Sequence, residues 1–192
     1  MPDYRSGVER ADQGRGVRAV MRAPWLAAAL ALAGCAGGGQ ASCDLEAQGA
    51  LTFTSADAQD TIVAQSIGPS CDKAIGLYVI RAADGYPIWS WSAPLAHHFG
   101  DVFAAEDREH VQDFLDTWVQ PRVSTTQAAP AWDSLAHGQT SLDRLTYEDI
   151  RARNLPMLCH FSGTARETCV FWEPAAGGAG HLLDRDVEEI NE

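Results

Sequence analysis

The chain has 192 residues, of which 46% are hydrophobic and 21% charged, which is the composition of an ordinary globular protein. Downstream of residue 34 it carries 9 basic and 23 acidic residues, a net charge of −14 at neutral pH. Such a surface repels phosphate backbones, so the composition argues against nucleic acid as a partner. It would attract basic proteins and divalent cations, but solubility beside an anionic membrane is the interpretation that we favour.

The first element in the chain is a short apolar run, residues 25–33, preceded by the basic residue Arg22. The run is much shorter than the roughly 20 apolar residues that a membrane-spanning helix needs. It ends in Leu32-Ala33-Gly34-Cys35, which resembles the lipobox of bacterial lipoprotein signals. Residues 1–34 are therefore expected to be an upstream extension and an export signal, with Met21 as a candidate true start.

The resemblance implies cleavage before Cys35 and lipid on that cysteine, which makes the membrane the expected partner of the mature chain. In such lipoproteins an Asp after the cysteine commonly retains the protein at the inner membrane, whereas this chain has Ala36. The resemblance thus implies anchoring in the outer membrane, with the domain facing the periplasm. Residues 35–42 are then expected to form the lipidated cysteine and a flexible tether, because residues 36–42 are small.

After the tether, residues 43–185 are expected to form a single α+β domain, and residues 186–192 an acidic tail. Asp84-Gly85 between two apolar runs is a strong hairpin signal, and Pro87 should begin the second strand of that hairpin or lie at a sheet edge. We expect a mostly antiparallel sheet built from hairpins. The predicted strands cover residues 51–54, 61–67, 74–81, 86–92, 122–126, 157–161, 168–172 and 181–184, with a glycine-rich loop at 177–180.

The main helix is predicted over residues 105–119. Its apolar residues recur at three- and four-residue spacing and so form one stripe, and Pro121 ends it. A second, shorter helix is expected to begin with Thr146 as N-cap and to end before Leu155.

Four further cysteines, an even number in an exported domain, predict two disulfides. We favour Cys43–Cys71 and Cys159–Cys169, because each pair brackets strands that are expected to be neighbours. A metal site is the alternative, but the spacings of 28, 88 and 10 residues match no zinc pattern. No metal or cofactor is therefore predicted.

Trp89 and Trp91 stand two residues apart, on one face of a predicted strand. Exposed, they would form a stacking platform for a sugar or a peptide. Buried, they would belong to the core, which is the interpretation that we favour for aromatic residues at this spacing.

No catalytic motif is found. His97, His98 and His160 would have to meet acidic side chains in one pocket to support an envelope hydrolase, the third functional hypothesis. Glu106, His110 and Asp113 share a helix face, but that face is the solvent side of an amphipathic helix, where charges are expected without a metal.

Residues 162–166, Ser-Gly-Thr-Ala-Arg, followed by Val-Phe-Trp at 170–172, resemble the Ser-Gly loop and aromatic strand of bacterial lipoprotein inhibitors of C-type lysozyme. The resemblance implies contacts to the enzyme through Ser162 and Arg166. The family's later lysine segment is absent, since residues 173–175 read Glu-Pro-Ala.

These patterns together predict a membrane-anchored periplasmic lipoprotein that acts as a non-catalytic binding or interaction module. Inhibition of a lysozyme-type hydrolase is the alternative.

Overall fold

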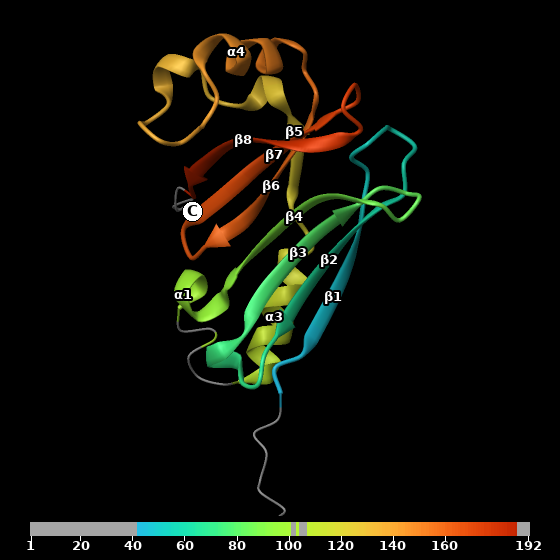
Figure 1. Cartoon of the computed structure of the whole chain (residues 1–192), viewed down its shortest axis with the longest axis vertical. Coiled ribbons are helices and arrows are strands. Elements are labelled where there is room, and N and C mark those ends of the chain that lie inside the picture. The colour runs from blue at the N-terminus through green and yellow to red at the C-terminus, as the bar shows by residue number, and fades with distance from the viewer. Residues whose placement is uncertain (1–41, 101–102, 104–106, 188–192) are drawn as a thin grey trace, which may run out of the picture. The chain divides into compact units, whose positions relative to one another are not determined.

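Two four-stranded antiparallel sheets with helices packed on them form the part of the chain that this computed structural model describes, residues 42–100, 103 and 107–187 (Figure 1). The first sheet has the order β1-β2-β3-β4, with bounds Leu45–Leu51, Asp60–Ile67, Ile75–Arg81 and Pro87–Pro94. The second has the order β5-β6-β7-β8, with bounds Arg122–Thr125, Pro156–Gly163, Arg166–Glu173 and Gly178–Asp186. The α+β prediction, with sheets built from hairpins, is confirmed.

The helices are short. The α-helices of the described residues are α1 (Leu95–Phe99), α3 (Arg108–Trp118) and α4 (Arg144–Ala152), and the 3-10 helices are η1 (Cys71–Lys73), η2 (Thr126–Ala128) and η3 (Trp132–Ser134). None of them is long and apolar enough to span a bilayer.

Helix α3 covers the first sheet with the predicted apolar stripe. Val111, Leu115 and Trp118 are buried against it. The indole of Trp118 also donates a hydrogen bond of 2.8 Å to the carbonyl oxygen of Phe161 on β6, which fastens the helix to the second sheet. Gly49 of β1 makes a close approach possible, because a Cβ there would collide with the carbonyl oxygen of Val119.

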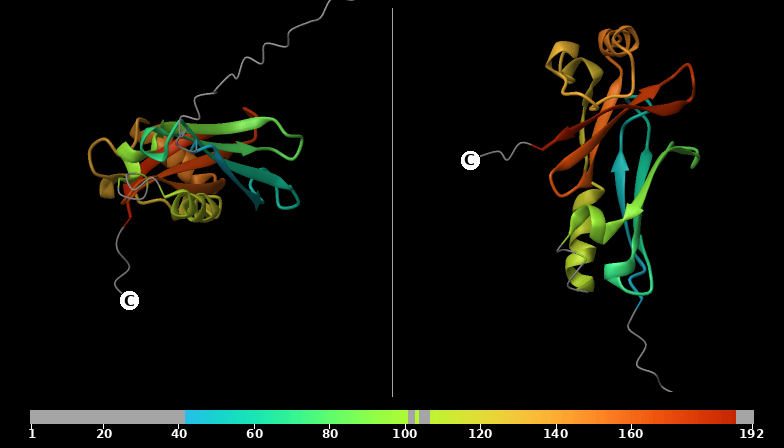
Figure 2. Two further views of the ribbon diagram at one scale, coloured as in Figure 1. Left: turned by 90° about the horizontal axis from the view of Figure 1, so that it is seen from below. Right: turned by 60° about the vertical axis from the view of Figure 1, so that its left-hand side comes forward.

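The second sheet is buried on both faces. Leu158 and Val170 point to the first sheet and join its core. The alternate positions pack with Tyr147 and Ile150 of α4 in a separate core, so that α4 covers the far face (Figure 2). The residues of the second sheet in that separate core are Met157, Cys159, Cys169, Phe171, Leu182 and Leu183.

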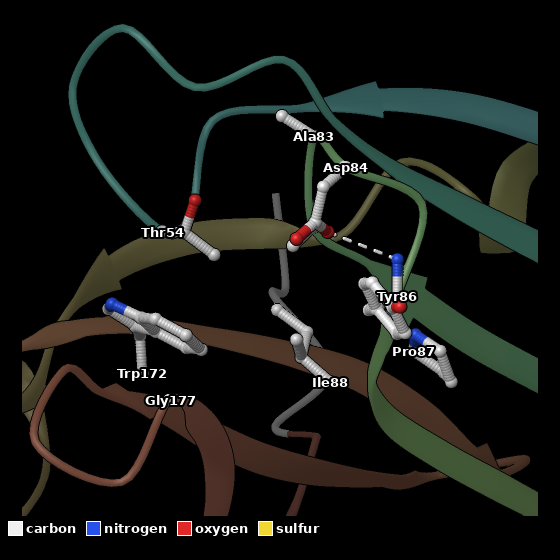
Figure 3. Close-up of a pocket in the computed structure, with 9 residues that line it drawn as sticks. Thr54, Ala83, Asp84, Tyr86, Pro87, Ile88, Trp172 and Gly177 are labelled. Carbon is white, nitrogen blue, oxygen red and sulfur yellow. Dashed lines mark hydrogen bonds between the residues drawn. The ribbon is translucent and has the colours of Figure 1, made fainter. Parts of the chain in front are cut away.

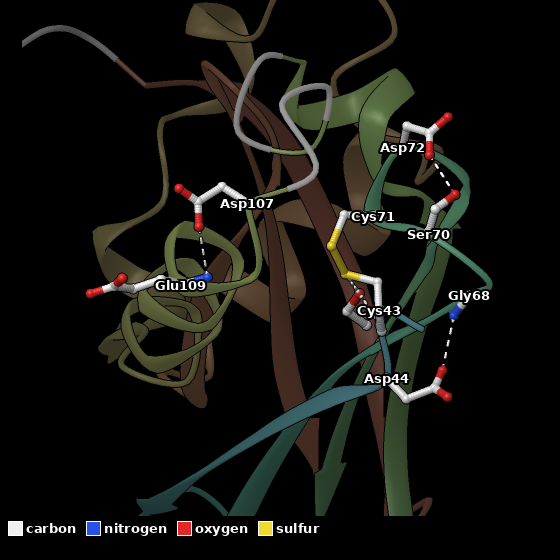
Figure 4. The surroundings of a disulfide bond; sticks show 9 residues. Cys43, Asp44, Gly68, Ser70, Cys71, Asp72, Asp107 and Glu109 are labelled. Atoms are coloured by element: carbon white, nitrogen blue, oxygen red, sulfur yellow. Dashed lines mark hydrogen bonds between the residues drawn. A yellow bond between two sulfur atoms is a disulfide. The ribbon is translucent and has the colours of Figure 1, made fainter. Parts of the chain in front are cut away.

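Both predicted disulfides are present. Cys43–Cys71 fixes the start of the domain to η1, and the amide of Cys43 also donates to the carbonyl oxygen of Gly68 at 2.8 Å (Figure 4). Cys159 and Cys169 are direct cross-strand partners on β6 and β7. Pro87 begins the edge strand β4, in agreement with both of its predicted positions.

Several predicted boundaries are wrong. The first strand is β1, and residues 52–54 lie in the loop after it. The N-cap of α4 is Asp143, whose carboxylate accepts from the amide of Thr146, so the helix begins before that threonine. Residues 178–180 are part of β8, because they pair with β7. This strand runs to Asp186, which was predicted to belong to the tail.

Candidate functional site

A cleft of about 680 Å³ is lined by residues of both halves of the domain. The β3–β4 turn, which contributes to it, lies at the end of the first sheet opposite residue 42 (Figure 1, Figure 2). The β1–β2 loop contributes Thr54, and the β3–β4 turn with the start of β4 contributes residues 82–84 and 86–88. The second sheet contributes Trp172 on β7 and Gly177 in the β7–β8 turn. Three chain segments that are distant in sequence therefore build one hollow.

Two aromatic side chains stand on opposite sides of this cleft, with Ile88 and the Asp84 carboxylate between them (Figure 3). Tyr86 is 72% exposed, which is unusual for so large a side chain. Trp172 is partly buried, since it also packs against the main core. One wall thus carries a fixed aromatic ring and the other a freely accessible one.

Asp60 links two of the chain segments that line the cleft. This buried carboxylate accepts hydrogen bonds from the amides of Phe53 and Thr54, at 2.9 and 2.7 Å, and from the amide of Ala83 at 3.1 Å. A carboxylate is acceptor-only and can take several donors at once. It therefore ties the β1–β2 loop to the β3–β4 turn and fixes the wall that they form.

The predicted Asp-Gly turn sets the position of the exposed ring. Gly85 has a φ of +87°, which favours glycine, and its amide donates to the carbonyl oxygen of Ala82 at 2.8 Å. Asp84 Oδ1 accepts from the amide of Tyr86 at 3.1 Å, so the carboxylate is oriented while most of its acceptor capacity stays free. Arg81 turns its guanidinium to the carbonyl oxygen of Gly85, and it does not line the cleft.

Trp89 and Trp91 point inward and pack against the core, as the favoured interpretation had it. Trp91 makes edge contacts with Trp118 and His98, with ring centroids 5.5 Å apart in each case. The indole of Trp89 donates to Nε2 of His160 at 3.3 Å. In this position the two tryptophans offer no open platform.

His160 is buried between the sheets as a neutral ring. Nε2 accepts from Trp89, Nδ1 donates to the carbonyl oxygen of Phe161 at 3.0 Å, and the ring stacks on Tyr78 at 4.3 Å between centroids. Burial lowers the pKa of His160 to about 4 and raises that of Tyr78 far above its usual range. Both ring nitrogens of the histidine are satisfied only in the neutral form.

The other histidines do not join His160 in an open pocket. His98 Nδ1 contacts the carbonyl oxygen of Ser162 at 2.9 Å, while His97 is exposed. Within the described ranges no group of three His, Cys, Asp or Glu side chains could hold a metal ion. Of the charged helix face, His110 pairs at the surface with Asp107, at 2.7 Å, and Glu106 lies outside the described residues.

Ser162 and Arg166 flank the β6–β7 turn but differ in accessibility. Ser162 is only 6% exposed. Arg166 is accessible and reaches Asp184 Oδ2 at 3.3 Å. Contact of both with an enzyme surface would require Ser162 to become exposed, so the inhibitor hypothesis gains no support at this position.

Asp60, Tyr86 and Trp172 were not predicted as site residues. The hairpin signal placed Tyr86 correctly next to the turn, but the pairing of that turn with Trp172 and Asp60 depends on contacts between distant segments. No protein-family model, no curated protein and no solved structure matches the chain. Cys35 lies outside the described residues.

Proposed function

We propose that the chain is a lipid-anchored protein of the bacterial cell envelope, most consistent with the outer membrane and a periplasm-facing domain. Its domain acts as a non-catalytic binding module, and the cleft between Tyr86 and Trp172 is its binding site. The lipobox-like Leu32-Ala33-Gly34-Cys35 supports the anchor, and the two disulfides support an oxidising compartment.

The observation that carries the binding function is the lining of the cleft. It presents two aromatic rings, the apolar Ile88 and one oriented carboxylate, Asp84. Binding sites typically combine apolar and aromatic walls with a few fixed polar groups. Its volume of about 680 Å³ lies within the usual range of roughly 300–1,000 Å³ for small-molecule sites.

The anchor is tested by growing cells that express the tagged full chain with an alkyne-labelled fatty acid. We expect label on the protein and a mature N-terminus at residue 35, with neither in the Cys35→Ser variant. An unlabelled protein whose N-terminus lies elsewhere would remove the anchor from the proposal.

The binding site is tested separately, with a photo-crosslinking amino acid in place of Tyr86. The matched control carries the same amino acid in place of Leu145, which is 84% exposed on α4 and does not line the cleft. We expect an adduct with an envelope component only from position 86. Adducts of equal yield from both positions, or none, would refute the cleft as the binding site.

A further inference from the structure

We propose that the ligand of the cleft is a carbohydrate chain, whose pyranose rings stack on Trp172 and Tyr86 and whose hydroxyl groups donate to Asp84. This inference rests on the proposed binding function and specifies its ligand class.

The aromatic rings carry the first part of the argument. A pyranose with equatorial substituents presents a flat face of C–H groups, whose positive edge matches the negative face of an aromatic ring. Trp172 and Tyr86 stand on opposite sides of a cleft of about 680 Å³, which leaves room for more than one sugar ring (Figure 3). Tyr86, at 72% exposed, already presents its ring to solvent.

The charge of the cleft and of the whole domain argues against an anionic ligand. Among the residues that the structure describes, no Lys, Arg or His lines the cleft, and the charged side chain in its lining is Asp84. The residues downstream of position 34 carry a net −14, so an anionic ligand would be repelled by both the site and the molecule. A carboxylate that faces an uncharged ligand is a good acceptor for neighbouring hydroxyl groups, because it has two oxygens and no donor of its own.

A cationic ligand is the competing chemistry, since ammonium groups also bind over aromatic faces. Recognition of that kind uses aromatic rings that close around a small charged group. Here the two rings are separated by the side chain of Ile88 and by an open space of a size that suits a larger ligand. The geometry therefore favours the sugar chain.

The walls are fixed before the ligand arrives. Asp60 ties the loop of Thr54 to the turn of Ala83, and Asp84 is oriented by the amide of Tyr86. A site whose loops are already ordered loses less conformational entropy on binding. This arrangement suits a weakly interacting, neutral ligand such as a sugar.

The probe is the β-1,4-linked tetramer of N-acetylglucosamine, whose substituents are all equatorial. It is titrated against the mature lipidated protein, which begins at Cys35, in a polyoxyethylene detergent that carries neither a sugar nor an ammonium group. Calorimetry and tryptophan fluorescence report binding. We expect saturable binding that Trp172→Ala and Tyr86→Ala each weaken roughly three- to tenfold, the range for one aromatic contact. Trp172→Phe and the distant control Leu145→Ala retain binding.

Two outcomes overturn the inference. In the first, the tetramer does not bind, or binds equally to the Trp172→Ala and Tyr86→Ala variants. In the second, tetramethylammonium prevents the crosslink at position 86 and the tetramer does not. The crosslinks from position 86 then separate this failure from that of the proposed function. A partner that is digested by protease but not by glycosidase keeps the binding module and removes the carbohydrate. No adduct at position 86 removes both.

Discussion

The buried neutral His160 predicts a specific loss of stability on mild acidification. Burial lowers its pKa from about 6.5 in an unfolded chain to about 4 in the folded protein. Below the unfolded pKa the unfolded chain binds a proton that the folded protein does not bind. The free energy of unfolding therefore falls as the pH drops through the window from about 6.5 to about 4, and levels off below it.

The magnitude follows from the width of this window. A difference of roughly 2.5 pKa units is equivalent to about 3 kcal/mol in full, of which about 2 kcal/mol is lost between pH 7 and pH 5. Protonation would also set an Nε2–H against the N–H of Trp89, which now donates to that nitrogen at 3.3 Å. The hydrogen-bond geometry and the lowered pKa thus both indicate that protonation of His160 destabilises the folded protein.

The assay is urea unfolding of the wild type and of His160→Gln at several pH values between 5 and 7. Gln cannot titrate but can still accept from Trp89. We expect the wild type to lose about 2 kcal/mol more than the variant over this range. Other groups contribute equally to both proteins, including His110, whose pKa is raised by Asp107 and which therefore favours folding at lower pH. Equal pH slopes in the two proteins, or an NMR titration of His160 with a midpoint near 6.5, would refute the reasoning.

Three substitutions test other contacts by urea unfolding. Asp60→Asn should lower the free energy of unfolding by about 3 kcal/mol, because Asn keeps one acceptor oxygen and its NH₂ group cannot accept the backbone hydrogen bond that the other carboxylate oxygen now accepts. Glu167→Ala should lower the free energy of unfolding by about 2 kcal/mol, because Glu167 is 3% exposed and its carboxylate accepts two hydrogen bonds from Arg185 of β8. The control Arg144→Ala breaks an exposed ion pair and should lower it by about 0.5 kcal/mol or less. Gly49→Ala should cost about 1–3 kcal/mol, because its Cβ would collide with a backbone carbonyl of the chain after α3, while Gly178→Ala has open space and should be nearly neutral.

Each of these predictions has a contradicting result. A fully stable Asp60→Asn protein would show that the two loops do not depend on the carboxylate. Equal effects of Glu167→Ala and Arg144→Ala would show that burial does not strengthen the first ion pair. A neutral Gly49→Ala change would mean that α3 can move away from β1 without cost.

Elements with a strong local signal were predicted well from the sequence. The Asp84-Gly85 turn and the stripe of α3 depend on residues close together in the chain, and both are found in the structure. Strand β1 was missed over most of its length, because Leu45–Leu51 reads as a mixture of polar and small residues. Its conformation is decided by pairing with β2, which no local pattern contains.

The candidate site was the least predictable part, for a related reason. Alternation along β4 correctly placed Trp89 and Trp91 on one face, and the sequence favoured a buried position for them, but it could not identify α3 and the second sheet as the elements that they pack against. Of the aromatic pair of the cleft, Tyr86 lies in the β3–β4 turn of the first sheet and Trp172 on β7 of the second. Only the packing of one sheet against the other brings them together.

The length of the tether and of the first sheet limits how far the cleft can lie from the anchoring membrane. The chain enters at Cys43, and β1 then runs seven residues, about 23 Å, toward the end where the cleft lies. Eight residue steps separate Cys43 from Cys35, which a fully extended chain spans in at most about 28 Å. Two further residue steps lead from Cys43 to β1, and Tyr86 lies next to the start of β4, three strand spacings of about 4.8 Å from β1. With lipid on Cys35, Tyr86 therefore stays within roughly 70 Å of the membrane surface. An envelope component that lies only farther than this from the anchoring membrane could not be the ligand of the cleft.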